Sequence, residues 1–461
     1  MTRLGAVAAV LLTSLVSGAT AAAPDPVEEI REEALHATRA LELVRSLTME
    51  VGPRSAGSDG DRRAVAWAVE RLAASGFDRV WTEPVTVPHW VRGQASAEIV
   101  APFPQSLVVT ALGGSVGTPE AGLEAEVVRF ETVDDLEAAP ADAVRGKIVF
   151  LDGRMERRRD GSGYGETVPN RGRGPAAGSE KGALAVVIRS VGTGTHRFPH
   201  TGGTRFAEGV QRIPAAALAI PDADILAHQL EMGKPVRLRL RLTSRFLADA
   251  ESANVLAEIQ GSERPGEIVL LACHLDSWDL GTGAIDDAAG CATVVEAARI
   301  AGRHRPRRTI RVLLAANEEH GLSGARAYAA AHEEEIAGHV LAFEADFGAG
   351  AVWAYASAVN PAAEGFLAAS QAALAPLGIE YAGTEARGGA DLIPLRQALV
   401  PLADLAQDGT YYFDYHHTAD DTFDKVDPEA LAQNVAAHAV LAWIAAHTDD
   451  ELRPAPPRED G

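Results

Sequence analysis

Several residue types are scarce in this chain of 461 residues, and each scarcity excludes a class of protein. Cysteine occurs only twice, at Cys273 and Cys291, so no disulfide framework holds the fold together. A bridge between these two is one option, and two separate thiols are the simpler expectation. Basic residues number 42 against 64 acidic ones, and no Lys- or Arg-rich block stands out. This balance excludes a basic surface that binds nucleic acid.

Long apolar runs are also lacking after the first residues of the chain. The run from Leu4 to Val16 follows Arg3 and precedes small residues, which is the order of a secretory signal peptide. It is shorter than the ~20 residues of a membrane span, and Gly, Thr and Ser interrupt it. We therefore expect residues 1–22 to be a cleaved signal peptide. The mature protein would be exported, secreted or periplasmic, without further membrane contact.

Hydrophobic residues make up 47% of the chain and charged residues 23%, which excludes extended disorder. At about 100–200 residues per domain, the length predicts two or three domains. Residues 23–91 are expected to begin the main domain, and residues 248–448 to complete it. Residues 92–247 differ in their sequence pattern: short runs typical of β-strands alternate with loops rich in Gly and Arg. They are expected to form an inserted domain. Residues 449–461 read as a loose tail.

After residue 250, continuous apolar runs alternate with Ala-rich stretches, which predicts an α/β sheet covered by helices on both faces. Strands are expected at 268–272, 310–315, 340–343 and 399–405, and helices at 287–302, 321–335, 361–375 and 428–446. Earlier in the chain, residues 27–48 have the spacing of one amphipathic helix, and Pro84 marks the strand around it as an edge strand. The alternation of Arg and apolar residues over 236–242 predicts a half-buried strand.

Functional sites in open α/β sheets gather beyond the carboxyl ends of strands. Here the ends of strands and loops carry imidazole and carboxylate groups at His274, Asp276, Asp286, Asp287, Glu318, Glu319, Asp346, His416 and His417. Such mixed donors suit zinc, whereas calcium and magnesium prefer oxygen alone. The donors exceed the three protein ligands of one catalytic zinc, so two metals that share a carboxylate fit better.

Each of these pairs has a simpler explanation when taken alone. A Glu pair that opens a helix compensates the helix dipole, and the Asp286–Asp287 pair could be a helix N-cap and its neighbour. A single His at a strand end is more often structural than a ligand. Their coincidence at successive strand ends of one sheet is what favours metal chemistry.

Four segments resemble the co-catalytic dizinc exopeptidases, a family that includes leucyl aminopeptidases and glutamate carboxypeptidases. They are HLDSWDLGTGAIDDAAG at 274–290, NEEHGLSGARAYA at 317–329, FEAD at 343–346 and HHTADDT at 416–422. The carboxypeptidase Q branch (plasma glutamate carboxypeptidase) also matches GPRSAGS at 52–58, WTEPVTVPHWVRG at 81–93 and GTGTHRFPHTGGTRF at 192–206. The resemblance implies an α/β zinc-exopeptidase core with a mixed, mostly parallel sheet flanked by helices. It also implies that the β-rich insertion is a protease-associated domain.

The resemblance further implies two zinc ions per chain. Asp286 would bridge them, with His274 and Asp346 completing one site and Glu319 and His417 the other. The spacing H-x-x-x-D-T of the family favours His417 over His416. An apolar residue before the bridging carboxylate favours Asp286 over Asp287.

For catalysis, the resemblance implies that Glu318 is the general base and that Asp276 orients the His274 imidazole. Tyr415 and His416 belong to an aromatic loop that is either ordinary packing or a substrate wall. Asp391 resembles a family position near the substrate and could meet a substrate amine.

The reaction expected from these residues is hydrolysis of dipeptides or short peptides close to a free terminus. Three alternatives stay open at this point: a general aminopeptidase that releases N-terminal residues, a glutaminyl cyclase-like enzyme with one zinc, and a non-catalytic receptor-like protein. The partner is a peptide substrate, and the sequence is compatible with a monomer or a homodimer.

Overall fold

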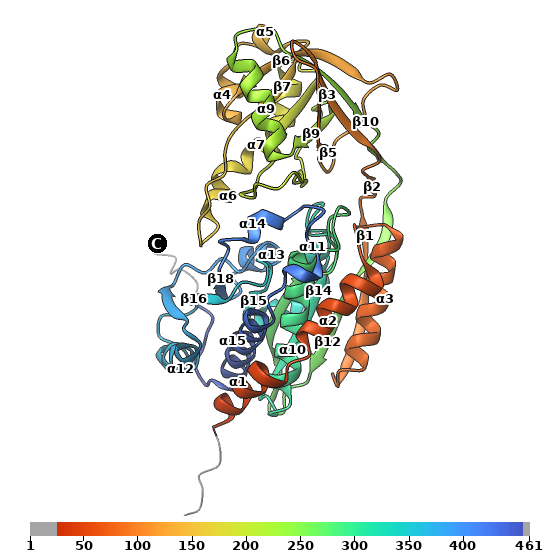
Figure 1. Cartoon of the computed structure of the whole chain (residues 1–461). Helices are drawn as coiled ribbons and strands as arrows, with labels where there is room; N and C mark the ends of the chain where they lie inside the picture. Colours follow the sequence, from red (N-terminus) through yellow and green to blue (C-terminus); the bar gives the residue numbers. More distant parts are fainter. Residues whose placement is uncertain (1–24, 455–461) are drawn as a thin grey trace, which may run out of the picture.

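The computed structural model describes residues 25–454, which fold around two eight-stranded sheets, one above the other in Figure 1. The predicted signal peptide at 1–22 lies outside the described residues, and the predicted tail at 449–461 is described only as far as residue 454. Within the described part of the chain, no helix has both the length and the apolar character needed to cross a membrane.

The first sheet is mixed, with the order β1-β12-β14-β13-β15-β18-β16-β17. Its strands are β1 Arg79–Val87, β12 Ala250–Ile259, β13 Arg264–His274, β14 Arg308–Ala315, β15 His339–Glu344, β16 Val352–Ala358, β17 Glu380–Gly383 and β18 Leu402–Gln407. Strands β14, β13, β15 and β18 run parallel at its centre. The pairs β1–β12, β12–β14 and β16–β18 are antiparallel, and β17 pairs parallel with β16 at the far edge. The mixed α/β sheet is therefore confirmed, and β1 lies at its edge as Pro84 predicts.

Helices cover both faces of this sheet. Along β13, Val269 and Leu271 enter one core while Leu270 and Ala272 enter the other, because successive strand residues point to opposite faces. The first face packs against α1 Pro26–Ala37, α2 Ala40–Ser46, α3 Asp59–Ala73, α10 Ala289–Gly302, α12 Glu364–Leu374 and α15 Pro428–His447. The second face packs against α11 Ser323–Ala331 and α13 Ile393–Gln397. Strands buried on both faces explain the continuous apolar runs in the sequence.

The single helix predicted over 27–48 is wrong, because the chain breaks between α1 and α2. At the break, the Arg39 N–H donates to Glu296 Oε2 at 2.9 Å, and the Arg39 guanidinium pairs with the same carboxylate at 3.2 Å. Glu296 is a buried residue of α10. The break satisfies this buried charge, which a regular helix could not do with its backbone N–H.

The second sheet is formed by the chain between β1 and β12, in the order β4-β3-β10-β6-β7-β8-β9-β5. Its strands are β3 Ala95–Ala101, β4 Gln105–Leu107, β5 Val109–Ala111, β6 Leu123–Phe130, β7 Ile148–Leu151, β8 Ala185–Arg189, β9 Ala215–Leu218 and β10 Arg237–Leu242. Its helices are α4 Val133–Ala138, α5 Ala141–Val144, α6 Ser162–Thr167, α7 Pro169–Gly172, α8 Gly174–Glu180 and α9 Ile220–Glu231. The entering strand β2 Trp90–Val91 pairs with the leaving strand β11 Arg245–Phe246. Burial alternates along β10, which confirms the predicted half-buried strand.

Candidate metal centre

Three parallel strands of the first sheet end at one edge, and imidazole or carboxylate side chains follow each of them. β13 ends at His274, β14 leads into Glu318–Glu319, and β15 leads into Asp346. Their carboxyl ends meet because the strands are parallel neighbours. Asp286 comes from the turn before α10, where its backbone is not helical, and His417 follows the short helix α14 Tyr412–Tyr415.

Asp286 lies between two groups of donors and turns one carboxylate oxygen to each. Its Oδ1 is 3.0 Å from His274 Nε2, which is 3.3 Å from Asp346 Oδ1. Its Oδ2 is 3.2 Å from His417 Nε2, which is 3.1 Å from Glu319 Oε2. The structure thus brings together the five side chains expected as ligands, here called the donor cluster, and Asp286 belongs to both groups.

Both imidazoles of the donor cluster are oriented through their second ring nitrogen. His274 Nδ1 donates to the carbonyl of Asp276 at 3.1 Å, and His417 Nδ1 donates to the carbonyl of Thr201 at 3.3 Å. A carbonyl oxygen only accepts, so Nδ1 carries a hydrogen and Nε2 is the ring nitrogen that a metal ion would bind. Metal-ligating histidines need this arrangement.

Carboxyl groups outnumber imidazoles in the donor cluster, and the pKa values reflect this excess. Burial raises the pKa of Glu319 and of Asp346, and the nearby imidazoles only partly offset it. Burial lowers the pKa of His417, but Glu319 and Asp286 outweigh it and raise the pKa to about 10. Among the described residues, Glu319 Oε1 has no hydrogen-bond partner. Buried negative charge, an unpartnered oxygen and mixed nitrogen and oxygen donors all fit zinc.

Asp287, the competitor of Asp286, faces away from the donor cluster. Its Oδ2 accepts the N–H of His274 at 3.2 Å, and its Oδ1 accepts the N–H of Gly290 at 3.0 Å. Both oxygens therefore bind backbone behind the end of β13. The carboxylate acts as a clamp between this strand end and the start of α10.

His416, the competitor of His417, lies at the border of the donor cluster. Its ring stacks on that of His417 with 3.5 Å between centroids, and its Nε2 is 3.6 Å from Asp286 Oδ2. Tyr412 and Phe413 also contact this ring. Burial lowers the pKa of His416 well below its usual value, and His417 adds to this effect. A neutral, enclosed ring at this position supports His417 by stacking.

Glu318 is anchored next to the donor cluster through its backbone. Its N–H donates to Asp276 Oδ1 at 2.9 Å, and the same oxygen lies 3.6 Å from His274 Nδ1. The ring of His274 is thus closer to the carbonyl of Asp276 than to its carboxylate. Burial raises the pKa of Glu318 well above its usual value, with Glu319 adding to the effect and His274 opposing it. A raised pKa brings a carboxylate closer to the range of a general base at neutral pH.

The two remaining residues expected near the substrate differ in their placement. Asp391 is buried, and neither of its carboxylate oxygens has a hydrogen-bond partner within the described residues. Its N–H donates to Glu344 Oε2 at 3.0 Å. Burial raises its pKa, and the charge of Glu318 raises it further, so Asp391 lies in the electrostatic field of the site. Tyr415 is half-buried beside Lys425, and its side chain makes no hydrogen bond to the donor cluster in the described structure.

Known proteins with similar sequences identify the family. The sequence profile of peptidase family M28 matches residues 254–442. Carboxypeptidase Q from Xenopus laevis is 34% identical over 433 residues, which cover 93% of this chain and 91% of that protein. Carboxypeptidase Q from Homo sapiens is 33% identical over 416 residues, covering 90% of this chain and 86% of that protein. The chain belongs to peptidase family M28.

Solved structures agree with this M28 assignment. The crystal structure of a peptidase M28 precursor from Shewanella amazonensis SB2B is 50% identical, has a TM-score of 0.92, and covers 94% of this chain and 98% of its own. An aminopeptidase from Aneurinibacillus sp. strain AM-1 shares the fold, with a TM-score of 0.64 at 20% identity. The match covers 93% of this chain and 99% of that one. The predicted α/β zinc-peptidase fold and the predicted metallo-exopeptidase are confirmed, and the chain is a carboxypeptidase Q-like M28 exopeptidase.

Two residues that hold the loops of this M28 site received no role from the sequence. Arg54 is fully buried and donates to three carbonyls within 275–283 at 2.6, 2.6 and 2.9 Å. Asp421 Oδ1 accepts the N–H groups of 284–285, both at 2.8 Å, directly before Asp286. Both residues lie inside matched motifs, but their partners are distant in sequence, so no local pattern reveals the contacts.

Loops of the second sheet also contact the segment that carries His417. The Thr201 N–H donates to the carbonyl of His417 at 2.9 Å, and His200 Nδ1 donates to the carbonyl of His416 at 2.8 Å. Arg171 Nη1 donates to the carbonyl of Thr201 at 3.3 Å and lies 3.4 Å from His417 Nδ1. The motif at 192–206 signalled this segment in the sequence without indicating what it touches.

Proposed function

We propose that this chain is an exported dizinc exopeptidase that hydrolyses dipeptides or short peptides next to a free terminus. The observation that carries the proposal is the shared position of Asp286, whose two oxygens face two separate imidazole–carboxylate pairs. One imidazole and one carboxylate on each side of a common carboxylate form a ligand set for two zinc ions. The signal-like segment at 4–16 supports the export part of the proposal.

Each chain would hold its zinc ions through five side chains. His274 and Asp346 would bind one ion, Glu319 and His417 the other, and Asp286 both. When bound, zinc supplies Lewis acidity toward the scissile carbonyl and the attacking water. The protein contributes two imidazoles that are already oriented, because each Nδ1 donates to a carbonyl.

Glu318 is the proposed general base. Its neighbour Glu319 turns into the donor cluster, so adjacent carboxylates can divide ligation from proton transfer. Glu318 takes a proton from the attacking water as the water oxygen bonds to the peptide carbonyl carbon. It then returns this proton to the leaving amine nitrogen as the peptide bond breaks. Asp276 acts as a positioning residue, since it fixes the Glu318 backbone and lies beside the His274 ring.

Asp391 supports a substrate with a free amino terminus. Its carboxylate is buried and lacks a hydrogen-bond partner within the described residues, and such a group is costly to bury without a donor or cation. A substrate ammonium would supply both donors and charge. Dipeptides with unblocked ends and N-terminal residues of longer peptides both carry this group, so a general aminopeptidase is the second candidate.

A small substrate panel separates the two candidates. The metal-loaded protein is incubated with free dipeptides, N-blocked dipeptides and aminoacyl-anilides, each with and without a chelator. Chelator-sensitive cleavage of free dipeptides alone would support the carboxypeptidase Q-like specificity. Cleavage of anilides would move the assignment to a general aminopeptidase, and cleavage of N-blocked dipeptides would contradict the role of Asp391.

The general-base role is tested by Glu318→Gln. This variant should keep its fold and its zinc content while kcat falls by about 10²–10⁴-fold, because the amide cannot accept the proton of water. Glu334→Gln, which changes an exposed Glu of the same chain, is the matched control and should retain full activity. Retained turnover in metal-loaded Glu318→Gln would contradict the base role, and loss of zinc would make Glu318 a ligand instead.

A further inference from the structure

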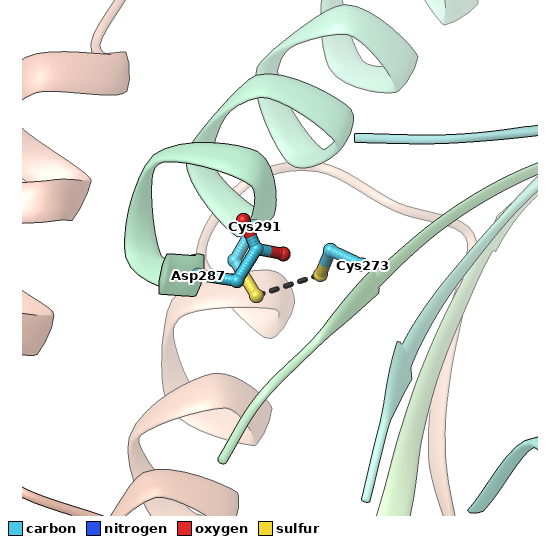
Figure 2. A group of neighbouring side chains, drawn as sticks. All are labelled: Cys273, Asp287 and Cys291. Atoms are coloured by element: carbon cyan, nitrogen blue, oxygen red, sulfur yellow. Dashed lines mark hydrogen bonds between the residues drawn. The ribbon is translucent and has the colours of Figure 1, made fainter. Parts of the chain in front are cut away.

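The two cysteines of the chain face each other, as Figure 2 shows. Cys273 is the last residue of β13 before His274, and Cys291 belongs to the first turn of α10. Their Sγ atoms are 2.6 Å apart. Both side chains are buried, with exposed fractions of 0% and 2%. Two sulfur atoms that close are nearer than two separate thiols can pack.

A metal ion does not account for this pair. With Zn–S bonds of about 2.3 Å in a tetrahedral site, two thiolates on one zinc lie roughly 3.7 Å apart, farther than the two sulfurs here. Asp287, the third side chain in Figure 2, already uses both oxygens on the N–H groups of His274 and Gly290. Asp287 thus has a structural role of its own, and the short distance between the sulfurs is what excludes an ion held by both thiolates.

We propose that Cys273 and Cys291 form an intramolecular disulfide that ties β13 to α10 behind the metal centre. Its formation breaks two S–H bonds and makes one S–S bond. Two protons go to solvent, and two electrons reduce the disulfide of a thiol oxidant, either a protein disulfide or glutathione disulfide. The oxidising compartment in which this occurs follows from the proposed export. Because both sulfurs are buried in the folded chain, the exchange takes place before folding is complete.

The position of this bond gives it a specific consequence. The closed loop runs from residue 273 to residue 291 and contains His274 and Asp286, one ligand from each end of the segment. Cys291 Sγ also contacts the carbonyl of His274 at 3.1 Å. The bond would therefore limit how far the strand that carries His274 can separate from the turn that carries Asp286. It should stabilise the apo protein, in which no metal holds these two ligands together.

Thiol labelling and mass measurement test the bond without depending on export or on peptidase activity. The purified full chain is unfolded and then refolded with oxidised and reduced glutathione. It is unfolded again in excess N-ethylmaleimide, and its mass is measured by mass spectrometry. The expected product carries no label and is lighter by two hydrogen atoms, and it takes up two labels after reduction. Two labels without reduction, or one glutathione on each cysteine, would overturn the proposal. A chelator added before labelling should change nothing, and labelling that appears only with chelator would assign the pair to a metal instead.

Thermal unfolding gives an independent readout. Reduction of the metal-free protein should lower Tm by roughly 3–6 °C, the range expected for a loop of this size in a chain of this length. The double variant Cys273→Ala/Cys291→Ala is the control, because its Tm should not respond to reductant. An equal response of the double variant would show that reduction acts elsewhere, and no response of the wild-type chain would contradict a stabilising bond.

Discussion

The two halves of the donor cluster are built in different ways. The half around His274 is assembled within the first sheet: His274 ends β13, Asp346 follows the neighbouring strand β15, and the carbonyl of Asp276 orients the imidazole two residues further on. The half around His417 takes Glu319 from the first sheet, but a loop of the second sheet orients its imidazole. The hydrogen bond between His417 and Thr201 joins residues 216 apart in the chain.

This difference separates local from long-range organisation. The position of the half around His274 follows from the strand order, because adjacent parallel strands present their carboxyl ends side by side. The second half requires the two sheets to meet correctly, through Thr201, His200 and Arg171. We therefore expect changes in the second sheet to affect one half of the centre and to spare the other.

The largest expected effect comes from Asp286→Ala, which removes the residue common to both halves. Metal content should fall from two zinc ions per chain to one or none, and kcat/KM by about 10³-fold or more, because charge stabilisation at the scissile carbonyl is lost. Elemental analysis of the purified variant and hydrolysis of a free dipeptide measure both. Glu334→Ala is the control, since this carboxylate is exposed and has no part in the donor cluster. Retention of two ions by Asp286→Ala would show that the halves do not share a ligand.

A second pair of variants compares the adjacent imidazoles. His417→Ala should lose one zinc ion and at least about 10²-fold in kcat/KM, because its Nε2 faces both Asp286 and Glu319. His416→Ala should keep both ions and lose less activity, since its ring only supports His417 by stacking. The reverse order of effects would make His416 the ligand. A chelator titration of each variant reports which half has weakened.

The smallest expected effect is also the most selective one. Arg171→Met removes the guanidinium that holds the carbonyl of Thr201. It should lower the zinc affinity of the site around His417 by about 10–100-fold and leave that of the site around His274 unchanged. Arg173→Met is the control, because Arg173 is exposed and pairs only with Asp134 and Glu137 among the described residues. Competition between the protein and a zinc-binding dye resolves the two affinities. Equal weakening of both sites would contradict the division into local and long-range halves.

Much of this site could be read from the sequence because its information is local. Apolar runs marked β13, β14 and β15, and the donors follow each run within a few residues. The prediction of one helix over 27–48 was wrong because a distant residue decides where the chain breaks. Its period is regular, but the buried charge of Glu296, more than 250 residues away, attracts the backbone N–H of Arg39 and ends the helix there. Periodicity describes which face is apolar and says nothing of a distant buried charge.

By itself, the sequence determined the α/β class, the edge of the sheet at which chemistry gathers and the donor types that suit zinc, since each depends on residues close together in the chain. Only the tertiary structure decided that Asp286 turns to the donor cluster while Asp287 turns to backbone. It also decided that Thr201 orients His417 and that the two sulfurs meet. These outcomes depend on side-chain direction and on contacts between distant segments, and both are set only when the two sheets and their helices pack together.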